Sequence, residues 1–381
     1  MTVEESKTAT KLAKKPLRVL HITFNMGIGG TEQVIRQLVQ GMASENVESE
    51  ILCIDGHIGS IGEALQQSGV PVHKLARKQG FDWALAQIIR KRLSARQFDV
   101  IHCHQYTPWV YGWLGALGTK AKVIFTEHGR FHPDKYRRKA RLINPILARL
   151  TPAIVAISEA TKNALVEYEY LPESKIQVIY NGIKPLTKNI KAAAAVREKL
   201  RIPAEALVIG TVSRIDPVKN QPMMLKAFKL LLNQHPSAHL LMVGDGPDKN
   251  MLMEMAKDLG LADNIIFTGF INTPVDYLAA MDIFLLSSHT EGTSMTLLES
   301  MSLGIPSVVT NVGGNPEIVE QNQTGLLTQT DQPEAFASAM ISLAKSPKLR
   351  QSLGAKAQAR FADRFSAKVM TNKYLELYAK H

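Results

Sequence analysis

Short apolar runs alternate with helix-like segments along most of the chain, and no other feature of the sequence limits the fold as strongly. The runs are rich in Val, Ile and Leu, and the segments after them have the spacing of amphipathic helices. Uninterrupted apolar runs indicate strands buried on both faces, as in parallel sheets with helices on either side. We therefore predict an α/β protein built from doubly wound parallel sheets.

The predicted strands fall into two groups. The first group comprises Arg18–Phe24, Glu50–Ile54, Val100–Cys103, Val123–Thr126, Ile154–Ala156 and Val178–Tyr180. The second comprises Val208–Val212, Leu240–Val243, Ile265–Thr268, Ile283–Leu286 and Ser307–Thr310. Between the groups, Asn181–Pro185 has the turn residues of a hinge. We expect a flexible tail over residues 1–16, domains over residues 17–185 and 186–364, and a final helix over residues 365–381.

Composition places this chain among ordinary globular proteins. Hydrophobic residues make up 45% of it, and no stretch approaches the ~18 uninterrupted apolar residues of a membrane-spanning helix. The segment Met1–Pro16 is polar and Lys-rich, so we do not expect a secretory signal. Cys53 and Cys103 lie apart in apolar runs, without the spacing of a metal site. Two isolated buried thiols suit a reducing compartment, so a cytoplasmic protein is expected.

The formal charge of +11 is concentrated in one stretch, between Arg130 and Arg149. Its basic residues are interleaved with apolar ones, which predicts a cationic helix with an apolar side. Such a helix can lie on an anionic membrane surface, although a solvated face is the simpler alternative. We see no nucleic-acid-binding motif, so nucleic acid is the least favoured partner.

Two glutamates follow the strand Ile283–Leu286. Glu291 lies in a loop, and Glu299 lies within the helix that Thr293 or Ser294 can cap. At ~1.5 Å per helical residue, their carboxylates are on the order of 10 Å apart. This separation is too large for a shared proton and suits two ends of one elongated ligand. Because the first amides of the helix point at the same place, we expect an anion between two hydroxyl-bearing groups, as in a nucleotide-sugar.

Two cations follow the strand Val208–Val212. Arg214 and Lys219 lie on a loop at the sheet edge where doubly wound folds bind ligands. Arg holds phosphate oxygens bidentately and Lys adds a point charge. The chain has no Asp-x-Asp triplet that would offer a carboxylate pair to a metal. The two cations could therefore stabilise a departing diphosphate electrostatically, although a solvated basic pair is the ordinary reading.

A glycine-rich loop follows the first predicted strand, over residues 25–32. Glycines there allow positive φ and close backbone approach. A dinucleotide-binding fingerprint starting at Gly27 would need glycine at position 32, which holds Glu32. This mismatch counts against a nicotinamide-dependent oxidoreductase, with Asp55 as the ribose acid. A tight strand-to-helix turn explains the glycines equally well.

Histidines mark the ends of two neighbouring predicted strands. His128 follows Val123–Thr126, so it should face a cleft between the domains, unless it is a hydrogen-bonded structural residue. His102 and His104 flank Cys103, and alternation along a strand puts both on the face opposite to it. His104 could touch an acceptor, whereas His102 is expected in the core.

This ordered set resembles the GT-B glycosyltransferases, in particular the large retaining family that includes sucrose synthases and lipopolysaccharide core transferases. The residues that carry the resemblance are Gly29 with Gly30, Arg214 with Lys219, the turn Gly244–Pro247, Glu291 with Glu299, and the segments Asn311–Glu317 and Thr324–Leu327. Each motif is short, but together they span most of the chain in the family's order. The resemblance implies two Rossmann-like domains facing a cleft, with the last helix packing back on the first domain.

The resemblance also implies roles for these residues. Arg214 and Lys219 would stabilise the departing diphosphate, helped by amides of Gly292, Thr293, Ser294 and Met295. Glu291 and His128 would hold the donor sugar, and Glu299 the ribose. Gly29 and Gly30 would lie near the donor phosphate and the acceptor, and Gly244 beside the nucleotide.

The implied reaction is a retaining, metal-independent hexosyl transfer from a nucleoside-diphosphate sugar. The acceptor is expected to be a lipid-linked or cell-surface polysaccharide intermediate, as in lipopolysaccharide and exopolysaccharide biosynthesis. The enzyme would lie peripherally on the inner face of the plasma membrane. Two alternatives share the fold: a catalytically silent nucleotide-sugar-binding protein and a sugar-nucleotide epimerase.

Overall fold

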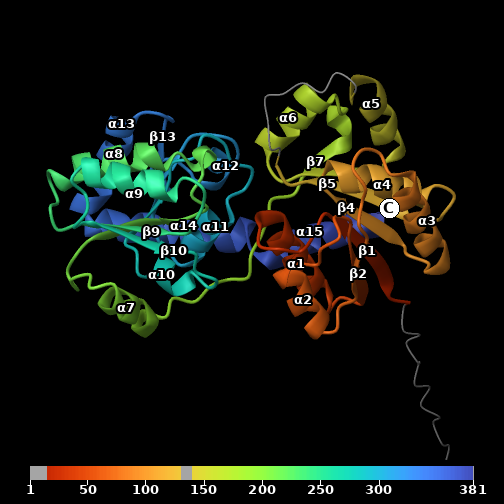
Figure 1. Ribbon diagram of the computed structural model, residues 1–381, viewed down its shortest axis with the longest axis horizontal. Coiled ribbons are helices and arrows are strands. Elements are labelled where there is room, and N and C mark those ends of the chain that lie inside the picture. The colour runs from red at the N-terminus through yellow and green to blue at the C-terminus, as the bar shows by residue number, and fades with distance from the viewer. Residues whose placement is uncertain (1–14, 130–139, 381) are drawn as a thin grey trace, which may run out of the picture.

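Two parallel sheets organise the molecule, which a computed structural model describes for residues 15–129 and 140–380 (Figure 1). The expected tail over residues 1–16 lies almost wholly outside the described residues, as do residues 130–139 of the basic stretch. The prediction of a two-domain α/β fold with GT-B architecture is confirmed. Figure 1 shows the two lobes side by side, with the C-terminal helix α15 (Ala367–Lys380) against the N-terminal one.

The N-terminal lobe has seven strands in the order β3-β2-β1-β4-β5-β6-β7, and every pair is parallel. The strands are β1 (Leu17–Thr23), β2 (Val47–Cys53), β3 (Val72–Lys74), β4 (Val100–His104), β5 (Lys122–Glu127), β6 (Ala153–Ala156) and β7 (Ile176–Val178). The helices are α1 (Gly30–Met42), α2 (Ser60–Gln67), α3 (Trp83–Ala95), α4 (Tyr106–Ala116), α5 (Ala140–Leu150) and α6 (Glu159–Glu169). Helices α3 to α6 pack on one face of the sheet, and α1 and α2 on the other.

The C-terminal lobe has six parallel strands in the order β10-β9-β8-β11-β12-β13. They are β8 (Val208–Val212), β9 (His239–Val243), β10 (Ile265–Gly269), β11 (Ile283–Leu286), β12 (Ser307–Thr310) and β13 (Gly325–Thr328). The helices are α7 (Ile190–Lys199), α8 (Gln221–Leu232), α9 (Lys249–Asp258), α10 (Val275–Ala279), α11 (Met295–Ser302), α12 (Asn315–Ile318), α13 (Pro333–Lys345) and α14 (Pro347–Arg364). In each sheet the order reverses next to the first strand, which is where doubly wound folds bind ligands.

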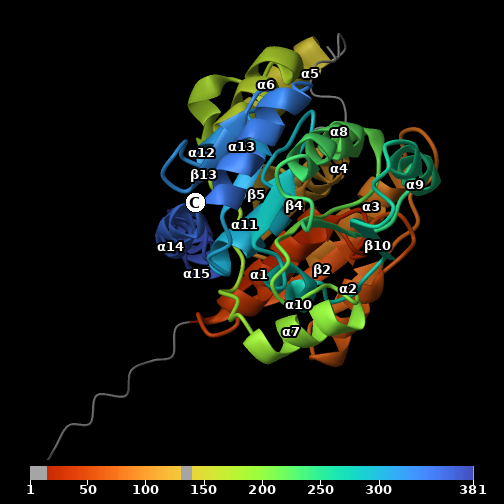
Figure 2. The same ribbon diagram turned by 90° about the vertical axis from the view of Figure 1, so that its left-hand side faces the viewer.

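The chain crosses between the lobes twice, at neighbouring places. After β7, a bridge pairs Ile183 with Ser366, between α14 and α15. Helix α15 then packs against α1 through Met370, Tyr374, Leu377 and Tyr378. Figure 2 shows α14 and α15 lying one after the other along the same side of the molecule. The C-terminal segment is therefore part of the core of the N-terminal lobe.

Two short edge strands, β3 and β13, were not predicted from the sequence. Predicted strand limits also differ at β2, which begins at Val47 rather than Glu50, and at β7, which covers Ile176–Val178 rather than Val178–Tyr180. Within residues 15–129 and 140–380, no helix combines the length and apolarity needed to cross a membrane.

Candidate active site

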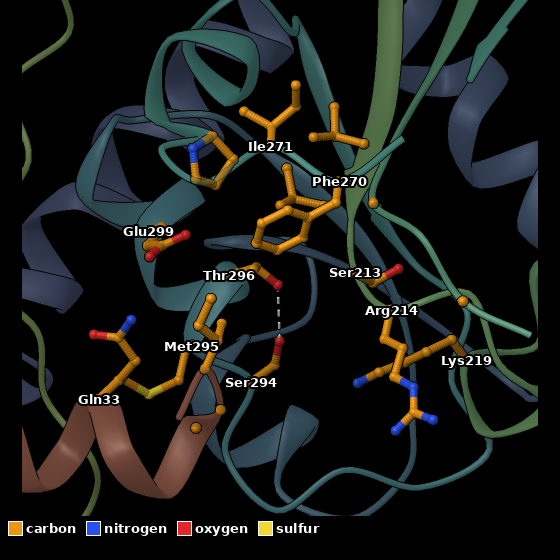
Figure 3. Close-up of a pocket in the computed structure, with 18 of the residues that line it drawn as sticks. Gln33, Ser213, Arg214, Lys219, Phe270, Ile271, Ser294, Met295, Thr296 and Glu299 are labelled. Atoms are coloured by element: carbon orange, nitrogen blue, oxygen red, sulfur yellow. Dashed lines mark hydrogen bonds between the residues drawn. The ribbon is translucent and has the colours of Figure 1, made fainter. Parts of the chain in front are cut away.

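A cavity of about 650 Å³ lies between the lobes and is lined by both. The N-terminal lobe contributes the loop before α1, together with the first turn of that helix. The C-terminal lobe contributes the ends of its central strands and the N-terminal part of α11 (Figure 3). Ten of the predicted site residues line it: Gly29, Gly30, Arg214, Lys219, Gly244, Glu291, Thr293, Ser294, Met295 and Glu299.

An ion pair occupies the basic corner of the cavity. Lys219 Nζ lies 2.7 Å from Glu291 Oε1, and that same oxygen accepts a hydrogen bond from Ser288 Oγ at 2.6 Å. The Lys219 backbone is held at the end of β11, because Ser287 Oγ donates to its carbonyl oxygen at 2.7 Å. Both partners are largely shielded from solvent, with side chains 23% and 9% exposed. The Lys219 ammonium and the Glu291 carboxylate are thus fixed relative to each other.

Arg214 provides a second, freer cation. Its side chain is 70% exposed, and its nearest acidic partner is Asp216, at 3.6 Å. In Figure 3 its guanidinium lies beside Lys219, at the same end of the cavity. Because an exposed ion pair contributes little stability, this guanidinium can turn to a phosphate at small cost.

The N-terminus of α11 points its amides at the cavity. Of the two hydroxyl residues proposed as caps, Ser294 is the N-cap and accepts from Leu297 N. Thr293 instead donates to the carbonyl oxygen of Ile157, in the N-terminal lobe, at 3.0 Å. The amides that precede the first helical hydrogen bond therefore remain available for an anion.

Glu299 faces the cavity from the second turn of α11, at the opposite end from Lys219 in Figure 3. Burial raises the pKa of its carboxyl group to about 7, and the charge of Arg36 opposes that shift only in part. A carboxylate that is costly to ionise gains from hydroxyl donors, because hydrogen bonds to the charged form favour it. Glu299 therefore offers hydrogen-bond acceptors to hydroxyl groups of a ligand at this end of the cavity.

The wall of the N-terminal lobe is formed by Ile28, Gly29, Gly30 and Gln33. The expectation that glycines provide positive φ here is wrong: Gly29 has φ −168° and caps α1, and Gly30 is helical. A Cβ on Gly30 would lie 3.8 Å from the side chain of Met295, across the cavity, which is ordinary contact. No described protein atom forbids a side chain at Gly30, but a larger residue there would take up room in the cavity.

Gly244 requires glycine for a different reason. It has φ +143°, and a Cβ would collide with the carbonyl oxygen of Ser213. The end of β9 is thereby packed directly against the loop that carries Arg214. Asp245 accepts from its neighbour Gly246 N at 2.8 Å and pairs with Lys249, so it is part of the turn's own structure.

Two predicted site residues, Gly292 and His128, do not line the cavity. They are nevertheless neighbours: a Cβ on Gly292 would lie 3.3 Å from the carbonyl oxygen of His128. The imidazole of His128 is hydrogen-bonded to His104, with 2.9 Å between His128 Nε2 and His104 Nδ1. His128 thus sits directly behind the loop that carries Glu291.

His104 is wholly buried, so the suggestion that it touches an acceptor is wrong for this structure. Its other nitrogen bonds to His21 Nδ1 at 3.0 Å. His102 is in the core, as expected. One ring nitrogen from each of His21, His102 and His104 lies within 4.8 Å of the other two, a spacing within reach of a shared cation. Among described atoms, hydrogen bonds engage every ring nitrogen of these three residues except His21 Nε2.

Several lining residues were not singled out from the sequence. The largest is Phe270, which is 58% exposed although it is an aromatic residue at the end of a strand. Ile271, Asn272 and Pro274 follow it, and Ser213 and Thr296 lie nearby. Each comes just after a predicted strand or within the helix start, so the strand-end rule that identified Arg214 could have identified Phe270 as well.

The arrangement can therefore bind an elongated anionic ligand. Arg214, Lys219 and the α11 amides lie toward one end. The Glu299 carboxylate can accept hydrogen bonds from hydroxyl groups, and the exposed ring of Phe270 can stack on a flat ring. The acid with raised pKa and the ion-paired acid have different environments, as expected for separate roles.

The comparisons with known proteins agree with this geometry. Residues 28–185 match the model described as Glycosyltransferase Family 4, and residues 193–360 match Glycosyl transferases group 1. N-acetyl-alpha-D-glucosaminyl L-malate synthase of Bacillus anthracis is 26% identical over 78% of this chain and 79% of its own length. UDP-Gal:alpha-D-GlcNAc-diphosphoundecaprenol alpha-1,3-galactosyltransferase of Escherichia coli is 24% identical over 87% of this chain and 89% of its own. The Anabaena HepE structure with UDP and glucose has a TM-score of 0.83 at 20% identity, covering 96% of this chain and 100% of that one.

Proposed function

Because this chain is a glycosyltransferase that belongs to the GT-B family, we propose that it moves a sugar from a nucleoside-diphosphate sugar to an acceptor hydroxyl with retention of configuration. The observation that carries the proposal is the placement of Lys219, Arg214 and the α11 amides on one cavity wall, facing a glycine-lined wall of the other lobe. Cations and helix amides stabilise the charge that develops as the diphosphate leaves.

We place the diphosphate, the ribose and the donor sugar at different positions along the cavity. The diphosphate lies by Lys219, Arg214 and the start of α11, and the ribose hydroxyls donate to Glu299. The donor sugar lies toward Glu291, with His128 on the side of the N-terminal lobe. Phosphate binding by Lys219 weakens its pairing with Glu291, so the carboxylate becomes free to accept sugar hydroxyls as the diphosphate arrives.

In the proposed reaction, the bond between the anomeric carbon and the phosphate oxygen breaks, and its electron pair stays on the diphosphate. The acceptor oxygen bonds to the same carbon on the same face, and its proton passes to the departing phosphate oxygen. No side chain is required as a covalent nucleophile. Since side chains and amides supply the positive charge at the diphosphate, we propose that the transfer is metal-independent.

Uridine diphosphate sugars are the first donors to test, since the HepE structure contains UDP and the galactosyltransferase is named for UDP-Gal. A thermal-shift screen should show a larger rise in melting temperature with one nucleoside diphosphate than with the others. Incubation with the matching nucleotide-sugar should release that diphosphate only when an acceptor is present. Isomerisation of the sugar without acceptor would instead indicate an epimerase, and binding without any turnover would indicate a silent binding protein.

We propose a lipid-linked acceptor, held at a membrane surface by α5. The described half of the basic stretch is this helix, and four large apolar side chains on it are exposed: Leu142 (77%), Ile143, Ile146 and Leu150. Arg141 and Arg149 accompany them. An exposed apolar stripe with basic flanks suits the headgroup region of an anionic bilayer. The enzyme would then be peripheral at the inner face of the plasma membrane and act in polysaccharide biosynthesis.

Co-sedimentation with vesicles containing anionic lipid tests the membrane proposal. Leu142→Ser with Ile146→Ser should greatly reduce the bound fraction. Ile190→Ser is the matched control, because Ile190 is equally exposed, at 76%, but lies on α7 of the other lobe. Equal binding by all three proteins would refute a role for α5.

A further inference from the structure

Three successive helices on the outer side of the N-terminal lobe contain no acidic residue. Helices α3, α4 and α5 have no Asp or Glu, whereas α3 and α5 carry Arg90, Lys91, Arg92, Arg141 and Arg149. The next helix on the same face of the sheet, α6, has three glutamates. Figure 1 shows α3, α4 and α5 along the right-hand side of the lobe, away from the C-terminal lobe. The acid-free composition is therefore confined to one surface.

This surface also holds most of the large apolar side chains that the lobe exposes. On α5 they are the four residues of its exposed stripe. On or directly beside α3 and α4 they are Phe81, Trp83, Ile88 and Leu117, of which Trp83 is the most exposed, at 66%. Among the described residues of this lobe, only Ile28 is a further example, and it lines the cavity. Exposed apolar groups gathered on one face are typical of a site of contact with a partner.

The aromatic pair Phe81 and Trp83 is held in place by the helices beneath it. Their rings meet edge to face, with centroids 4.8 Å apart, and Phe81 also stacks on Tyr111 of α4, at 5.5 Å. Asp82, between them, caps α3 by accepting from Leu85 N at 3.1 Å. The amide of Asp82 donates to Tyr111 Oη at 2.8 Å. Because this segment is already ordered, docking of the two rings costs little conformational freedom.

Basic side chains beside this pair have no acidic partner. Among the described residues, no carboxylate forms an ion pair with Arg77, Lys78, Arg90 or Lys91, whereas Arg92 pairs with the buried Glu50. Arg77 Nη1 instead donates to the carbonyl oxygens of Lys78 and Gly80, at 3.3 and 2.9 Å. The charge of these side chains is therefore available to an anionic partner.

A bilayer with anionic headgroups matches both properties of the surface. Tryptophan is enriched at the interface between membrane and water, and basic side chains are attracted to anionic headgroups. The surface is also continuous with α5, since Tyr106 of α4 donates to Asn144 of α5 at 2.6 Å. A second copy of this chain is a poorer match, because two surfaces with the same positive charge would face each other.

We propose that Phe81 and Trp83 insert into the headgroup region of an anionic membrane, as a second attachment point beside α5. This inference rests on the membrane contact put forward under the proposed function. It adds the part of the lobe that fixes the orientation of the enzyme. Attachment through two different helices prevents the lobe from pivoting about α5 alone, so the cavity keeps a constant direction relative to the bilayer and to an acceptor held in it.

Tryptophan fluorescence tests the insertion directly. The chain has three tryptophans, and Trp109 is fully buried, so Trp113→Phe leaves Trp83 as the exposed one. Anionic vesicles whose lipids carry brominated acyl chains should quench most of its emission, relative to the same vesicles without bromine. Adding Trp83→Phe should remove the quenching. Binding of Trp113→Phe to the vesicles without quenching would overturn the insertion and leave α5 as the sole attachment.

Co-sedimentation provides a second measurement. Phe81→Ser with Trp83→Ser should lower binding to anionic vesicles about tenfold or more, and wild type should bind far less to neutral phosphatidylcholine vesicles. The matched control is Met251→Ser with Met253→Ser, because these two apolar residues are exposed on α9 of the other lobe. Melting temperatures show that each variant is folded. Equal binding by both double variants, or no binding by wild type, would refute the proposal.

The same variants identify a different partner if the membrane is not the occupant. A wild-type dimer in lipid-free solution that Phe81→Ser with Trp83→Ser dissociates would show that a second copy covers the surface. None of these measurements uses a nucleotide or an acceptor. Loss of sugar transfer with intact quenching would contradict the proposed reaction alone, whereas sugar transfer without quenching would contradict this inference alone.

Discussion

The two walls of the cavity use different chemistry. The wall of the C-terminal lobe carries cations, carboxylates and helix amides, and its ion pair is already formed. The wall of the N-terminal lobe presents glycines and Gln33, and the core of the same lobe holds the buried histidines His21 and His104, whose pKa values are lowered by burial. Under the proposed function, the first wall would bind the charged nucleotide, and the second would face the neutral sugar and the acceptor.

The two lobes also differ in how they accommodate buried ionisable side chains. Lys219 and Glu291 pair with each other, 2.7 Å apart. The histidines lose their charge, because burial lowers their pKa values far below 7. The charged groups of the C-terminal wall can change partners as charge develops on the ligand. The neutral histidines of the N-terminal lobe instead hold hydrogen bonds of fixed direction. Variants of the C-terminal wall should therefore alter nucleotide binding and turnover, and those of the N-terminal wall should alter sugar recognition.

The largest effect is expected at Lys219. Lys219→Ala should lower turnover by ~10²-fold or more, the scale seen when one transition-state charge stabiliser is lost. Steady-state kinetics with saturating donor measures this. The control is Lys249→Ala: Lys249 also pairs with an acid, Asp245, at 3.0 Å, but it does not line the cavity. An unchanged rate in Lys219→Ala would remove this lysine from the mechanism.

A smaller loss is expected at Phe270. If its exposed ring stacks on the nucleotide base, Phe270→Ala should weaken nucleoside-diphosphate binding by ~1–3 kcal/mol, since stacking on an aromatic residue is worth that much per base. Calorimetry with the free diphosphate measures the change. Phe81→Ala removes an aromatic residue of similar exposure, 52%, from the N-terminal lobe and should leave the affinity as it was. Equal affinities in both variants would show that the base lies elsewhere.

Glu299 should make nucleotide binding depend on pH. Its pKa is about 7 in the free protein, so the ionised form that accepts ribose hydroxyls rises from about a tenth at pH 6 to about nine-tenths at pH 8. Affinity should increase up to about tenfold over this range, with release of a proton on binding at pH 7. Glu299→Gln controls for titration of the ligand's own phosphate, which affects both proteins. The same pH dependence in both would contradict the assignment.

The sequence predicted the strands that carry this site because they are long, apolar and buried on both faces. It missed β3 and β13, which are short edge strands whose existence depends on pairing with a neighbour; only Val72 is buried in β3. Residues that follow the central strands, such as Arg214 and Glu291, were predictable because the strand before each of them fixes its position at the edge of the sheet.

The hydrogen bonds of His104 with His21 and His128 could not be predicted from the sequence. His21 and His104 are far apart in sequence and meet only because β1 and β4 pair side by side, in the register His21 to His102. Likewise, nothing local shows that Tyr378 reaches His102 from the last helix. Contacts of this kind are set by the order of strands in the sheet and not by any spacing of residues.

The smallest effect concerns one of the contacts that join the two lobes. Glu317, in α12, accepts hydrogen bonds from the backbone amides of Glu159 and Ala160, at 2.7 and 2.9 Å, at the start of α6 in the other lobe. A carboxylate at a helix N-terminus satisfies free amides and the helix dipole. Glu317→Ala should cost about 1 kcal/mol of unfolding free energy and let those two amides exchange faster with deuterium.

The control is Glu320→Ala, because Glu320 pairs with Arg360 inside the C-terminal lobe and touches no amide of α6 in the described contacts. Its loss should leave exchange at residues 159 and 160 unchanged. Hydrogen exchange with bound nucleoside diphosphate adds a second comparison. If the lobes close on the nucleotide, the same amides should become more protected in the wild type but not in Glu317→Ala. Protection in both proteins would show that α12 and α6 are held together by other contacts, such as that of Thr293 with Ile157.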